Sequence, residues 1–114
     1  MTPRRCHDIG RALKNSIEAS TIDLKVAVAA SGGLSHFIVD AALDRSVLTA
    51  LQGRDAQTLR SIPQGALNSG SSEIRNWIMA AAALDDMPMR WSEYYPARRT
   101  PAGTGTGIAF AAWH

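Results

Sequence analysis

The sequence predicts an α/β fold, a small layered domain of helices and strands in one unit from residue 1 to 114. Three observations indicate this class. Residues 4–19 have the apolar period of an amphipathic helix. Residues 24–30 form a short apolar run, typical of a strand covered on both faces. A glycine-rich loop, residues 31–36, follows that run, and this order of elements favours helices layered on a sheet.

Each element is predicted from its own pattern. The stripe of the first helix consists of Cys6, Ile9, Leu13 and Ile17. Further helices are expected at 39–52 (with Gly53 as its C-cap), 54–62 (stopped by Pro63) and 73–84, with one turn at 64–67 and a flexible polar turn at 68–72. Strands are expected at 87–95 and 108–113, joined by a Gly-, Pro- and Thr-rich loop, 96–107.

Composition places the chain among ordinary globular proteins. Of its 114 residues, 46% are hydrophobic and 19% are charged, which argues against disorder. The longest apolar runs are far shorter than the roughly eighteen residues of a membrane span, and we expect no secretory signal, because no apolar region follows the first basic residues. A single cysteine, Cys6, cannot form an internal disulfide, so we expect a cytoplasmic protein.

The charge pattern gives little support to nucleic-acid binding. The formal net charge is +2 and the basic residues are scattered, apart from the pairs Arg4-Arg5 and Arg98-Arg99. Arg98-Arg99 follows two tyrosines, so a small basic binding module is one hypothesis, but such sites usually need a clustered basic stripe. We therefore expect neither a nucleic-acid partner nor a membrane partner.

His36 is the first candidate site residue. It ends the loop Ser31-Gly-Gly-Leu-Ser-His36 after the predicted strand, and loops on rigid scaffolds often carry function. A phosphate-cradling loop is a rival interpretation, but the chain lacks the G-x-G-x-x-G and G-K-[ST] spacings. A lone histidine is more often structural than catalytic, so the residues alone leave both roles open.

Glu73 is the second candidate. It lies where the turn 68–72 becomes a helix, and free N–H groups at a helix start favour an ionised carboxylate. Spacing alone therefore also allows a Glu73 that only helps the helix begin.

Three motifs, taken together, resemble the class III extradiol ring-cleavage dioxygenases, the enzymes of the protocatechuate 4,5-dioxygenase and gallate dioxygenase type. They are Val-Ala-Ala-Ser-Gly-Gly-Leu-Ser-His36, Leu-Asn-Ser-Gly-Ser-Ser-Glu73-Ile-Arg-Asn-Trp and Arg-Thr-Pro-Ala-Gly-Thr-Gly-Thr-Gly-Ile-Ala-Phe. The similarity runs through nearly the whole chain and matches only the C-terminal part of that catalytic subunit and of its fold.

The resemblance implies a non-haem Fe(II) centre, held by two histidines and one carboxylate, that takes a catecholic substrate and O2. Glu73 matches the family's carboxylate ligand, and His36 matches its acid–base histidine. An imidazole can take a proton from a catechol and return it. The loop 98–107 is similar to a substrate-side loop of the family, in which Thr100 is a candidate substrate contact.

The chain departs from the family at the two histidine ligands, which come from the family's N-terminal part. The remaining histidines, His7 and His114, correspond to neither ligand. We therefore expect the chain to bind no Fe(II) competently and to be inactive alone, with a complementing N-terminal half or a homo-oligomer as partner. A non-catalytic domain that works by oligomerisation or protein association is the alternative, since an uncovered strand edge favours association.

Overall fold

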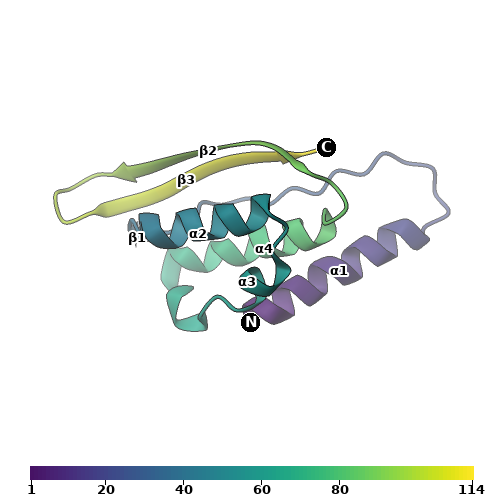
Figure 1. Cartoon of the computed structure of the whole chain (residues 1–114), viewed down its shortest axis with the longest axis horizontal. Coiled ribbons are helices and arrows are strands. Elements are labelled where there is room, and N and C mark those ends of the chain that lie inside the picture. Colours follow the sequence, from purple (N-terminus) through teal and green to yellow (C-terminus); the bar gives the residue numbers. More distant parts are fainter.

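The computed structural model describes residues 1–114 and shows helices packed against one face of a small antiparallel sheet (Figure 1). The elements are α1 (Pro3–Ala19), β1 (His36–Ile38), α2 (Ala41–Gln52), α3 (Ala56–Arg60), the 3-10 turns η1 (Gln64–Ala66) and η2 (Ser69–Glu73), α4 (Ile74–Ala83), β2 (Met89–Arg98) and β3 (Thr104–Trp113). The strand order is β1-β3-β2. The predicted α/β class, a small layered domain, is confirmed.

The helices begin where the sequence supplies a cap. Thr2 accepts a hydrogen bond from the Arg5 N–H at the start of α1, and Asp40 accepts one from the Leu43 N–H at the start of α2. Each cap satisfies a backbone donor that the first turn leaves free. Gly53 ends α2 as predicted, while α3 is shorter than the expected 54–62 and the turn before Glu73 is a 3-10 helix.

The buried face of α1 differs from the predicted stripe. Cys6 is fully buried, but Ile9 is 37% and Leu13 is 45% exposed. The helix instead packs through Gly10, where an added Cβ would lie 2.2 Å from the Met79 carbonyl oxygen. Because Gly10 lets α1 approach α4 so closely, the contact face turns toward it and part of the apolar stripe faces solvent.

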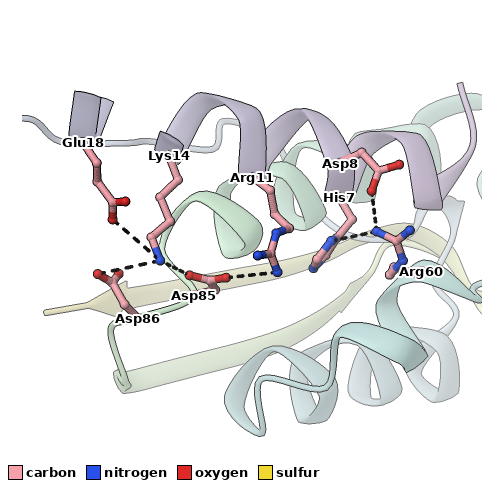
Figure 2. Close-up of polar contacts among 8 residues, drawn as sticks. All are labelled: His7, Asp8, Arg11, Lys14, Glu18, Arg60, Asp85 and Asp86. Carbon is pink, nitrogen blue, oxygen red and sulfur yellow. Dashed lines mark hydrogen bonds and ion pairs between the residues drawn. The ribbon is translucent and has the colours of Figure 1, made fainter. Parts of the chain in front are cut away.

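Charged side chains along α1 fix its position against the neighbouring elements, as Figure 2 shows. Lys14 donates to Asp85 at the end of α4, and Arg11 lies 3.7 Å from the same carboxylate. At the other end Arg60 of α3 bonds to Asp8 at 2.6 Å. These links connect α1 to both ends of the helical layer, although partly exposed ion pairs each stabilise a fold only modestly.

The predicted strand at 24–30 is wrong. Residues 20–35 connect α1 to β1 as extended chain outside the sheet, and Leu24 and Val26 are largely exposed. The composition of the run suits a covered strand, but a strand also needs a hydrogen-bonded neighbour. The register of β3 shows why none is available: β1 pairs only with Thr104–Thr106, and along Ile108–Trp113 only β2 pairs with β3. A groove of about 690 Å³ separates residues 26–30 from that part of β3.

The predicted loop 96–107 is also too long. β2 continues through Pro96 to Arg98 and β3 begins at Thr104, so the connection is a short turn. Proline is tolerated there because β2 is an edge strand. Gly105 adopts φ +151°, and an added Cβ would lie 1.9 Å from the Ala97 carbonyl oxygen, so a glycine is required inside this strand.

The core lies between the helical layer and the inner face of the sheet. The last helix, α4, supplies Ile74, Trp77 and Ile78, which are at most 5% exposed. No buried side-chain nitrogen or oxygen lacks a hydrogen-bond partner. None of the helices has the length and apolarity needed to cross a membrane.

Candidate functional site

His36 and Glu73, far apart in the sequence, lie side by side in the fold. The His36 Nε2 lies 3.3 Å from the Glu73 Oε2, with side chains 22% and 41% exposed. His36 opens β1 and Glu73 ends the 3-10 turn before α4. The two candidate residues therefore form one partly exposed pair of an imidazole and a carboxylate.

The side chain of Glu73 is directed away from the helix that it precedes. Glu73 is the N-cap residue of α4, but its side chain makes no capping hydrogen bond. The Oε2 instead accepts a bond from the Gly33 backbone N–H at 2.9 Å. A carboxylate directed away from its own helix contributes little as a cap, so helix initiation does not account for its orientation.

Glycines surround the pair and leave no space for side chains. An added Cβ would lie 2.5 Å from the Glu73 Oε2 at Gly32, 2.7 Å from the His36 Nε2 at Gly33 and 2.2 Å from the His36 Cβ at Gly70. All three separations are shorter than real Cβ contacts allow. The Ser-Gly-Gly and Ser-Gly-Ser motifs therefore act as a close-fitting wall around the imidazole and the carboxylate.

Backbone and hydroxyl contacts hold the His36 loop in place. The His36 N–H donates to the Ser71 Oγ at 3.0 Å. The Leu34 N–H donates to the Gly107 carbonyl, and the Gly107 N–H donates to the Ser35 carbonyl, both at 2.8 Å. These bonds tie the loop to the turn before α4 and to β3, so the imidazole lies on a fixed support.

A fully buried carboxylate, Asp44 of α2, lies behind this loop. Its oxygens accept hydrogen bonds from the Ser35 N–H at 2.9 Å, the Ser35 Oγ at 2.6 Å and the Tyr94 hydroxyl at 2.6 Å. An added Cβ at Gly107 would lie 2.0 Å from the Asp44 Oδ2. Three donors to one carboxylate stabilise a charge that would otherwise be costly to bury.

The sequence analysis did not identify this network, although a signal was present. Asp44 lies three residues before Val47 and seven before Leu51, and so on the core face of a predicted helix, where a charged residue needs partners. Burial and the hydrogen bond to Asp44 raise the pKa of Tyr94, which keeps its phenol protonated as a donor. Ser35 gave no comparable signal, because serine is common in loops.

The other predicted or considered residues lie elsewhere. Thr100 is exposed in the turn between β2 and β3, where its hydroxyl is 2.7 Å from that of Thr104. Thr104 pairs with Ile38, whereas His36 pairs with Thr106, so the turn lies beyond the end of β1. His7 is buried on α1 with its Nδ1 3.1 Å from an Arg60 nitrogen. His114 follows the last residue of β3.

These side chains do not by themselves make a complete metal centre. No group of three or more His, Cys, Asp or Glu side chains comes together in this chain. His36 and Glu73 would provide one imidazole and one carboxylate, whereas an iron site of the two-histidine, one-carboxylate type needs three ligands. The residues present therefore do not fit a resident Fe(II) ion within a single copy of the chain.

Fold and site together define a small α/β domain that presents a histidine–carboxylate pair in a glycine-lined wall. The family model described as the catalytic LigB subunit of aromatic ring-opening dioxygenase matches residues 1–109, and the chain belongs to this family. A stretch of 35 residues is 54% identical to gallate dioxygenase of Pseudomonas putida; it covers 31% of this chain and 10% of that relative. No solved structure matches the chain.

Proposed function

We propose that this chain supplies the acid–base histidine and the ligand carboxylate of a non-haem Fe(II) extradiol dioxygenase, which opens catecholic rings of the protocatechuate or gallate type with O2. Membership of the ring-opening dioxygenase family supports the class of reaction. The observation that carries the residue roles is the 3.3 Å approach of His36 and Glu73 inside the glycine wall. The two residues come from separate motifs and meet in space, which supports a shared role.

His36 is the proposed proton acceptor and donor. Its ring is partly exposed, and its backbone is held through Ser71 and the Leu34–Gly107 pairing. A catechol hydroxyl placed against the imidazole can lose its proton to the ring and recover one later, provided that the ring keeps a fixed orientation.

Glu73 is also the proposed carboxylate ligand of Fe(II), and Thr100 is the proposed substrate contact. Because the chain brings together fewer than three ligand side chains, the histidine ligands have to come from outside it. We therefore expect the isolated chain to be inactive. The active assembly would form in the cytoplasm with a partner, either a complementing N-terminal part of such a subunit or further copies of the chain. Catechol and O2 are the proposed substrates of the complete assembly.

The test is complementation under anaerobic conditions. The chain is mixed or co-expressed with the N-terminal part of the Pseudomonas putida gallate dioxygenase, and Fe(II) binding is measured before oxygen uptake with gallate. The chain alone should give no uptake, and the mixture should restore it. In the mixture, Glu73→Gln should weaken Fe(II) binding, whereas His36→Ala should keep the metal and lower turnover at least about a hundredfold.

Glu18→Gln provides a matched control, because Glu18 is an exposed carboxylate on α1 away from the pair. It should change neither metal binding nor turnover. Equal loss of iron in the His36 and Glu73 variants would contradict the separate roles, and no uptake in any mixture would contradict the proposal as a whole.

A second candidate function is a non-catalytic domain that works by association. The exposed apolar residues of the segment between α1 and β1 favour it. This candidate predicts self-association or capture of another protein together with no oxygen uptake in any mixture.

A further inference from the structure

The connection between α1 and β1 carries an apolar face that this chain does not cover. Ile22 is 69% exposed, Leu24 is 71% exposed and Val26 is 58% exposed. All three side chains line one groove beside the end of α1, so these three residues share one face. Large apolar side chains scattered singly are normal, but three in a row on one extended segment form a patch that favours association.

The backbone of the same segment is almost free of hydrogen bonds. Between residues 21 and 30, the Ile22 N–H donates to the Ser20 Oγ at 3.3 Å and the Leu24 N–H donates to the Ile22 carbonyl at 3.1 Å. No backbone group from Lys25 to Ala30 bonds to another part of the chain. An extended segment with unpaired N–H and C=O groups is a template for another strand.

Asp23 and Lys25, which alternate with the apolar residues, restrict which strand can pair with the segment. Asp23 and Lys25 are exposed, and neither forms an ion pair or a side-chain hydrogen bond within the chain. In an antiparallel pair, residues opposite each other are neighbours, and opposite charges there stabilise the pair. If Leu24 lies opposite its own copy, Asp23 of each chain lies opposite Lys25 of the partner subunit. A second copy of this chain therefore has the charge order that the segment requires.

We propose that two copies of this chain associate through antiparallel pairing of residues 21–27, centred on Leu24. The pairing places Ile22 opposite Val26 of the partner subunit, so that all six apolar side chains lie on one face. It forms two equivalent Asp23–Lys25 pairs on the other face, and the interface is two-fold and self-complementary.

The surface beside the segment is also apolar and can contact the side chains of the partner subunit. A groove of about 280 Å³ is lined by Ile22, Leu24 and Val26 together with Ser16, Ile17 and Ser20 near the end of α1. Leu13, one turn before Ile17 on the same side of α1, is 45% exposed. The apolar surface therefore continues from the segment along the helix, which also accounts for the α1 stripe that the core leaves uncovered.

The association is tested by charge reversal at two exposed positions. Sedimentation equilibrium over a concentration series compares the unchanged chain with Asp23→Lys, Lys25→Asp and the variant that carries both changes. Each single change turns two attractive pairs into two repulsive ones and should raise the dimer Kd about tenfold or more. The variant with both changes restores both pairs in reversed order and should dimerise within about threefold of the unchanged chain.

Mixing the two single variants is the most specific measurement. A heterodimer of the Asp23→Lys and Lys25→Asp chains has opposite charges at both pairs, so the mixture should dimerise although each variant alone is largely monomeric. Circular dichroism should show the same fold in every sample, because both side chains are exposed and neither forms an ion pair within the chain.

Two results would overturn the proposal: a chain that is monomeric over the whole series, or a dimer whose Kd is the same in all variants. Neither iron nor substrate enters this test. Its failure would therefore leave the proposed dioxygenase role untouched, and failure of the complementation test would leave the dimer untouched.

Discussion

Residues 20–30 and 31–44 follow one another in the chain but differ in how many of their polar groups have partners. Both stretches expose large apolar side chains, which in the second are Phe37 and Ile38. In the second stretch, Leu34 is fully buried and the Ser35, His36 and Asp44 polar groups have partners. In the first, Leu24 is 71% exposed and the backbone beyond it is unpaired. The comparison teaches that apolar composition predicts burial only where a complementary surface exists in the same chain. The first stretch has no such surface within this chain.

The prediction with the largest expected effect concerns the buried hydrogen bonds of Asp44 behind the His36 loop. Asp44→Ala leaves the Ser35 N–H, the Ser35 hydroxyl and the Tyr94 hydroxyl without their acceptor, so we expect a loss of about 3–5 kcal/mol in the free energy of unfolding. Urea denaturation measures it. Tyr94→Phe removes only one of the three bonds and should cost about 1–2 kcal/mol. Equal losses in the two variants would show that the carboxylate does not anchor Ser35.

The second prediction compares one residue type in the two stretches. Leu34→Ala creates a cavity at a fully buried position and should cost about 2–5 kcal/mol. Leu24→Ala changes an exposed side chain and should shift the free energy of unfolding by less than about 0.5 kcal/mol. Both are measured by urea denaturation at a dilution where the chain is monomeric. A large loss in the Leu24 variant there would mean that this chain covers its own segment.

The third prediction concerns the glycine wall. Gly70→Ala places a Cβ 2.2 Å from the His36 Cβ, so His36 or the Ser69–Glu73 turn has to move, at a cost of about 1–3 kcal/mol. Gly65→Ala is the matched control, since nothing lies within 4 Å of the added Cβ. NMR spectra should show the His36 ring signals shifted in the first variant and unchanged in the second. Unchanged signals in both would remove the argument that Gly70 positions the imidazole.

Features that depend on nearby residues could be predicted from the sequence, whereas features that depend on distant residues could not. The helices 3–19, 41–52 and 74–83 follow from apolar periods, and the first two also have capping residues at their starts. The motifs marked His36 and Glu73 as candidates, and the fold brings them together as one pair. The composition of the segment 24–30 is typical of a strand, but composition cannot show whether a neighbouring strand is available. Pairing is a property of distant residues.

The same reasoning explains the other differences. Loop-forming residues such as Pro96 and Gly105 lie inside β2 and β3, because an edge strand tolerates proline and a close approach to Ala97 requires glycine. The buried face of α1 depends on Gly10 meeting α4, a contact that the pattern of α1 alone does not contain. Asp44 was the one buried polar residue that the helical period could have flagged.

The smallest expected effect lies on the helical layer, away from both stretches. Burial and the neighbouring Arg60 and Arg11 charges lower the pKa of His7, so the folded chain binds that proton less readily than the unfolded chain. The free energy of unfolding should therefore fall as the pH drops below about 6.5, and level off once it is below the folded-state pKa. The contact between Arg60 and the His7 Nδ1 agrees with a lowered pKa, because the arginine donates and the Nδ1 has to accept.

His7→Gln should flatten this pH dependence in urea titrations at a series of pH values, whereas Ser61→Ala, an exposed change beside Arg60, should leave it as it is. An unchanged slope in the His7 variant would assign the pH dependence to another group.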